Sequence, residues 1–144
     1  MAKRKAKKKT VKKANKKTKL KKKTYTHHPD HYNRSEDFLV EPLDEDLKDA
    51  WFKIREFGEG LGPQRIYASG RAIMFSKKVC YFFVRPKKKY LETVIFLKRP
   101  QISENFKSVV STKVKWSHTF RLVHADQVEG ELTEAISDAF AEIE

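Results

Sequence analysis

Cysteine is scarce in this sequence of 144 residues, and long apolar runs are missing. The single cysteine, Cys80, excludes an intrachain disulfide and fits a reducing compartment. No stretch approaches the roughly 18 apolar residues that suggest a transmembrane helix. The charged N-terminus also lacks the apolar segment of a secretory signal. We therefore expect no membrane partner and a cytoplasmic or nucleoid-associated location.

Acidic residues are nearly absent from the start of the chain. Residues 1–34 contain 15 lysines and arginines but one acid, Asp30, and so carry a net charge of +14. Residues 35–144 contain 17 basic and 18 acidic residues, which gives a net charge of −1. The positive charge of the whole chain, +13, therefore belongs to its N-terminal segment.

The lysine-rich tail (residues 1–34) begins MAKRKAKKKTVKKANKKTKLKKKT, and no apolar period emerges from it. We therefore expect this tail to be disordered when free. Flexible lysines neutralise phosphates and release counterions without reading the base sequence. The tail thus predicts nonspecific nucleic-acid binding, with DNA favoured over RNA. The predicted phosphate contacts are Lys3, Arg4, Lys5, Lys7, Lys8, Lys9, Lys12, Lys13, Lys16, Lys17, Lys19, Lys21, Lys22 and Lys23.

The tail also has other interpretations. Its partner could be an anionic membrane or another polyanion, although the missing amphipathic pattern argues against a membrane, or it could have no partner. A metal ion could bind the side chains of His27, His28, Asp30 and His31. Their spacing matches no zinc motif, however, and Cys80 is far away in the sequence. We expect no metal and no cofactor.

Two segments have the apolar spacing of amphipathic helices. The first runs from Leu43 to Phe57, with acids in its first turn and glycines at its end. The second follows Asp126, which forms a capping pattern with Glu129, and its apolar stripe extends to Ile143. These two helices are expected at the two ends of one domain.

Strands are expected between the helices. The central feature is a hairpin over residues 79–97, in which two runs of β-branched and aromatic residues flank the basic turn RPKKK. Further strands are expected over residues 65–69, 72–76 and 115–123, whereas residues 98–113 are polar and irregular. Tight turns between strands predict an α+β fold: a two-layer sandwich of a mainly antiparallel five-stranded sheet with both helices packed on one face. The expected organisation is a tail (1–34), a linker (35–42) and an α+β domain (43–144).

The segments FVRPKKKYLETVIFL and KWSHTFRLVHADQVEGELTEAISDAF contain several motifs in order. A strand ends in a V-x-P-x-K turn, a second strand follows, and later a W-x-H-x-x-R-L strand leads to a V-x-x-E-L helix. In these features the chain resembles the family catalogued as domain of unknown function 5655, over about residues 43–142. The resemblance implies a small α+β domain of bacterial type, often appended to other modules, with no established activity.

The turn of the central hairpin gives a second candidate site. Lys87, Lys88 and Lys89, together with Arg85, could add a phosphate contact beside the tail. The alternative is a solvated turn with no partner.

His118 has the same strand parity as Trp116 and Phe120, which predicts that it faces the core. A histidine there is either a hydrogen-bonded core residue or an acid or base in a pocket shared with Arg121. Cys80 has the character of a small core hydrophobe. No nucleophile is paired with a base, and no glycine-rich phosphate loop is present. The sequence therefore argues against an enzyme. The alternative functions are a protein-interaction module and an enzyme accessory domain with a pocket near His118.

Aromatic residues of the expected strands could stack unpaired bases. The candidates are Tyr67, Tyr81, Tyr90 and Trp116. Core packing is the simpler explanation for each of them. A large apolar patch on the face without helices would instead favour self-association or a protein partner through the sheet.

Overall fold

A computed structural model of the chain describes residues 36–144. The predicted tail lies outside the described residues, as do the four candidate metal ligands at positions 27, 28, 30 and 31. The described part is an antiparallel six-stranded sheet with the strand order β1-β2-β3-β4-β6-β5. The strands are β1 (Arg65–Ser69), β2 (Ala72–Ser76), β3 (Cys80–Pro86), β4 (Leu91–Leu97), β5 (Ser108–Ser111) and β6 (Trp116–Leu122).

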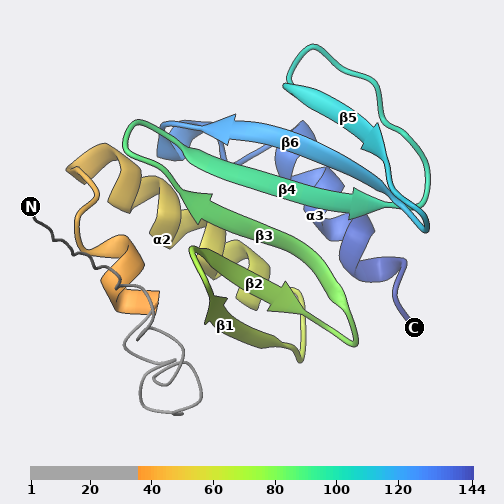
Figure 1. Cartoon of the computed structure of the whole chain (residues 1–144), viewed down its shortest axis with the longest axis horizontal. Coiled ribbons are helices and arrows are strands. Elements are labelled where there is room, and N and C mark those ends of the chain that lie inside the picture. The colour runs from red at the N-terminus through yellow and green to blue at the C-terminus, as the bar shows by residue number, and fades with distance from the viewer. Residues whose placement is uncertain (1–35) are drawn as a thin grey trace, which may run out of the picture. The chain divides into compact units, whose positions relative to one another are not determined.

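Two helices cover one face of this sheet, α2 (Glu45–Glu59) and α3 (Glu131–Ala141) (Figure 1). Each helix has an apolar stripe that must be buried, and the sheet offers an apolar face to receive both stripes. The predicted α+β sandwich of two layers is therefore confirmed.

The number of strands differs from the prediction. The segment 98–113 was expected to be irregular, but it contains β5, which pairs with β6 at the edge of the sheet. This strand has four residues, and three of them are exposed. A short edge strand with one half-buried position has no alternation of apolar and polar residues for a sequence pattern to detect.

The first helix covers Glu45–Glu59, two residues further along the chain than the expected Leu43 to Phe57. The side chain of Asp44 accepts a hydrogen bond from the backbone N–H of Leu47 at 2.9 Å, which caps the N-terminus of α2. Gly60 ends the helix. Gly58 lies in the last turn of this helix. A Cβ at this position would lie 3.1 Å from the ring of Phe75, which favours glycine here. The glycine thus allows close packing of α2 on the sheet.

The start of the second helix was predicted wrongly. A capping pattern was expected at Asp126, but residues Ala125–Gln127 form a short 3-10 helix, η5, with its own capping box between His124 and Gln127. The α-helix begins later, after Gly130, whose φ of 58° interrupts the helical backbone. The interruption separates the two helical segments, and Val128 between them is buried in the core.

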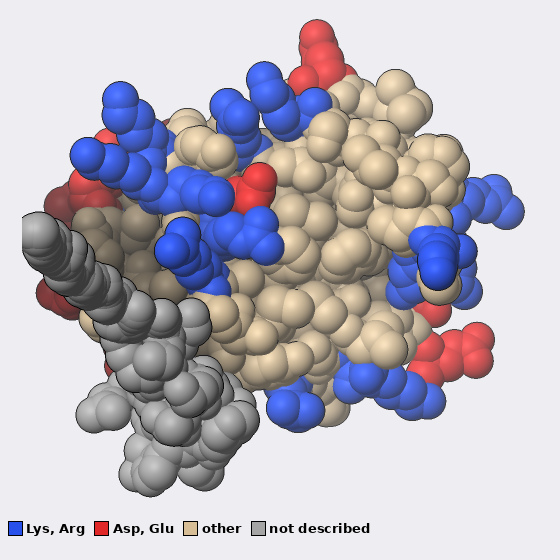
Figure 2. All heavy atoms as spheres, viewed as in Figure 1, with Lys and Arg blue, Asp and Glu red and all other residues tan. Residues whose placement is uncertain are grey.

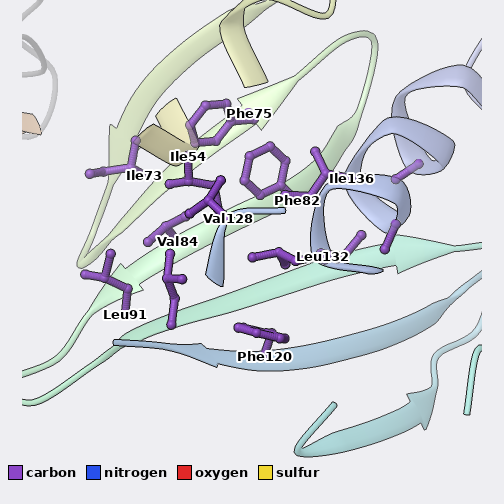
Figure 3. Packing of buried hydrophobic residues seen from close by; sticks show 14 of the residues in the cluster. Ile54, Ile73, Phe75, Phe82, Val84, Leu91, Phe120, Val128, Leu132 and Ile136 are labelled. Atoms are coloured by element: carbon purple, nitrogen blue, oxygen red, sulfur yellow. The ribbon is translucent and has the colours of Figure 1, made fainter. Parts of the chain in front are cut away.

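The core lies between the sheet and the helices (Figure 3). Phe75 and Phe82 stack with ring centroids 4.2 Å apart, and Trp51 meets Phe75 edge-on. Residues 36–40, which were expected in a linker, are helical, and Val40 joins this core. The core therefore includes a residue ahead of position 43, where the domain was expected to begin.

Candidate nucleic-acid interface

One end of the sheet gathers cations at the turn between β3 and β4. We call it the basic end and define it as Arg85, Lys87, Lys88, Lys89 and Arg121. The three lysines are exposed in the turn, which a hydrogen bond from the N–H of Lys87 to the carbonyl of residue 90 closes at 2.8 Å. A turn of three lysines at the rim is expected because lysines in succession cannot be buried.

The two arginines of the basic end share one face of the sheet. Glu92 is the cross-strand neighbour of Arg85 on one side and of Arg121 on the other. Arg85 Nη1 lies 2.9 Å from the carboxylate of Glu92. Together the five cations and the Glu92 carboxylate carry a formal charge of about +4 at neutral pH. The basic end is therefore a site that favours anions. In Figure 2 lysines and arginines border a broad uncharged surface.

Aromatic rings hold the guanidinium groups of this face. Arg121 Cζ lies 4.6 Å from the ring centroid of Tyr90, and Arg85 Cζ lies 5.1 Å from that of Phe83. At the far side of the sheet the same arrangement joins Arg65 to its strand neighbour Tyr67, at 4.7 Å. Such contacts orient a guanidinium and leave N–H groups at its edge for a phosphate.

His118 lies in the core, as its parity predicts, and is fully buried. Its Nε2 accepts a hydrogen bond from the N–H of Gln101 at 2.8 Å. Its Nδ1 lies 3.3 Å from the carbonyl oxygen of Ile95 and 3.2 Å from that of Trp116. This pattern assigns the neutral tautomer with a proton on Nδ1. Both ring nitrogens serve the backbone, so His118 has the geometry of a core residue.

The structure does not bring His118 and Arg121 together. They lie three positions apart on β6 and therefore point to opposite faces of the sheet. Arg121 is exposed, whereas His118 is buried on the face of the sheet that the helices cover. These two residues therefore do not line a common pocket, contrary to the expectation from the sequence.

The four aromatic candidates for base stacking also divide between the faces. A β-bulge between β2 and β3 places Tyr81 on the helix side, where its ring meets Phe140 at 5.2 Å. Trp116 lies opposite Leu97, a core residue, and so faces the helices as well. Two of the four candidates, Tyr67 and Tyr90, contact the arginines described above.

A polar cluster around Glu131 was missed by sequence reasoning. Its carboxylate accepts hydrogen bonds from Gln101 at 3.3 Å, Ser103 at 2.8 Å and Asn105 at 2.7 Å. The bond from Asn105, followed by that from Ser103, lowers the pKa of Glu131. The cluster fastens the loop between β4 and β5 to the start of α3. No spacing in the sequence indicates this, because the partners lie about 30 residues apart.

Cys80 is half-buried at the start of β3. Burial raises the pKa of its thiol to about 11, so it is protonated at neutral pH and is a poor nucleophile. Within residues 36–144, no three side chains of His, Cys, Asp or Glu are placed to share a metal ion. None of the helices described is both long and apolar enough to cross a membrane.

The fold and the charged face define a two-layer α+β domain with a basic end on the open side of its sheet. The chain belongs to the family described as Domain of unknown function (DUF5655), whose model matches residues 35–142. The resemblance inferred from the hairpin and the last strand is thereby confirmed. No curated protein and no solved structure matches the chain.

Proposed function

We propose that this chain binds nucleic acid without sequence preference, through contacts between its cations and phosphates. The supporting observation is the separation of charge: +14 lies in residues 1–34, against −1 in the rest of the chain. A charge of one sign concentrated in a single segment has a polyanion as its natural partner.

The domain adds a smaller contribution at its basic end. Lys87, Lys88 and Lys89 are exposed, and they lie beside the two arginines of the same cluster. Lysine side chains on a turn contact phosphates as point charges and read no base edges. We therefore assign the tail the larger share of the affinity and the basic end a secondary one.

The dependence of binding on salt measures the number of phosphates engaged. If about eight tail cations contact a duplex, log K falls by roughly 7 for each tenfold rise in salt, or about 10⁴-fold over a fourfold rise. The same affinity should be found for duplexes of unrelated sequence.

The test compares the chain with a full-length variant in which the 14 basic residues from Lys3 to Lys23 are glutamine. Both are titrated against a labelled random-sequence duplex across a salt series. The proposal expects tight, steeply salt-dependent binding by the chain and a much shallower slope for the variant. A control variant with glutamine at the exposed Lys53 and Lys113 should retain the slope. Absence of binding by the unmodified chain at low salt would refute the proposal.

A further inference from the structure

The face of the sheet that carries no helix has an apolar centre. We call it the open face and define it as Tyr67, Met74, Phe83, Val94, Phe96 and Thr119. Five of these residues, all except Phe96, form one row across neighbouring strands: Tyr67 lies opposite Met74, Met74 opposite Phe83, Phe83 opposite Val94, and Val94 opposite Thr119. The row crosses the sheet from β1 to β6.

Two aromatic rings lie together on this open face. The rings of Phe83 and Phe96 have centroids 6.0 Å apart and are tilted by 47°. Both are half-buried, so part of each ring is accessible to solvent. Neither belongs to the core cluster between the sheet and the helices. In Figure 2 the centre of this side of the domain is uncharged, and the charged side chains, most of them lysines and arginines, lie around it.

The charges around the open face are mainly positive. Arg65 lies on Tyr67 at one side, and Arg85 lies on Phe83 next to the basic end. Glu92, the carboxylate among these strand residues, is paired with Arg85. An aromatic centre with a cationic border is complementary to a ligand that has both flat rings and negative charge.

We infer that the open face binds single-stranded nucleic acid, with phosphates at the basic end and unpaired bases stacked on Phe96 and, once Arg85 turns from its ring to a phosphate, on Phe83. The inference rests on the proposed function and adds a preference for single strands. A stacked base needs one free π-face, which a strand without a partner offers and a duplex does not. Stacking is also tolerant of base identity, in agreement with a protein that reads no sequence.

A second copy of this chain fits the open face less well. Arg65 borders the open face at β1. Arg85 on β3 and Arg121 on β6 border it at the basic end. Two such faces in contact would bring apolar centres together but would also enclose cations from both copies. Burial of Arg65 and Arg121, for which residues 36–144 provide no ion pair, opposes association, whereas phosphates would neutralise them.

The test uses the full chain with leucine at both Phe83 and Phe96, which keeps apolar volume and removes the flat rings. Binding to a labelled single-stranded oligonucleotide and to a duplex is measured at about 0.3 M salt, where the tail's electrostatic term is weak. Loss of one base stack corresponds to about 5-fold to 150-fold weaker binding, and we expect at least the smaller loss, for the single strand alone. The control is Phe52→Leu, since Phe52 is an exposed phenylalanine (58 %) on α2.

Unchanged single-strand affinity in a variant with a normal circular dichroism spectrum and melting temperature would overturn the inference. Steeply salt-dependent duplex binding would in that case leave the proposed function standing. Failure of the unmodified chain to bind either ligand at low salt would overturn both. If the double variant does not fold, photo-cross-linking of the unmodified chain to an iodouridine oligonucleotide decides. Cross-links within β3 and β4 support the inference, and cross-links only outside the strands refute it.

Discussion

The side chain of Lys77 joins the loop between β2 and β3 to the C-terminal end of α3. Its Nζ donates hydrogen bonds to the carbonyl oxygens of Phe140, at 3.1 Å, and Ile143, at 2.5 Å. It also lies 4.3 Å from the centroid of the Phe140 ring. The last turn of α3 contains no basic residue of its own. Lys77 therefore neutralises the negative end of this helix from a distant part of the sequence.

Lys77→Met keeps the apolar stem and removes the charge and both hydrogen bonds. A cation at a helix C-terminus contributes about 0.3–1 kcal/mol, and a cation over an aromatic ring about 0.5–1 kcal/mol at an exposed site. The two hydrogen bonds add little to this sum, because Lys77 is only half-buried and solvent screens its charge. The expected loss is about 1–2 kcal/mol of the free energy of unfolding.

Urea unfolding of the full chain, followed by circular dichroism, measures this loss. With a slope of about 2 kcal/mol per molar urea, the midpoint should fall by roughly 0.5–1 M while the slope stays the same. The adjacent Lys78 is exposed, and Lys78→Met is the matched control, with an expected change within about 0.5 kcal/mol. A midpoint for Lys77→Met equal to that of the control would refute the proposed capping role.

Three further changes test other contacts of the fold. Gly58→Ala should destabilise the chain by about 1 kcal/mol in urea unfolding, because crowding against the ring of Phe75, itself held by stacking, outweighs the better helix propensity of alanine; a stabilised variant would contradict this. His118→Leu should cost about 2 kcal/mol, since it leaves the N–H of Gln101 without its acceptor, yet it should leave nucleic-acid affinity unchanged; weakened binding in a folded variant would restore the pocket hypothesis. The lowered pKa of Glu131 means that its stabilising contribution is present above its ordinary value of 4.5 and is lost as the pH falls through the folded-state value. The difference in melting temperature between the chain and Glu131→Gln should therefore shrink below about pH 4.5, and a difference independent of pH would exclude this linkage.

Local patterns in the sequence determined the main elements of the domain. Asp44 and Gly60 mark the two ends of α2, because a cap and a helix stop act through neighbouring backbone groups. The alternation in the last strand placed His118 in the core, since side chains two apart share a face. The same alternation already separates His118 from Arg121, so the idea of a shared pocket could have been rejected from parity alone. The charge of the tail is likewise a property of composition.

Contacts between distant segments were decided only by the tertiary structure. The bulge that turns Tyr81 toward the helices depends on the register of β2 against β3. The edge strand β5 exists because β6 offers unpaired backbone groups, although its own sequence has little strand pattern. The contacts of Lys77 with α3 and of the β4–β5 loop with Glu131 join residues about 30 to 66 positions apart. A local pattern reports only which face of its own element a residue occupies, whereas the partner on that face depends on how the whole chain packs.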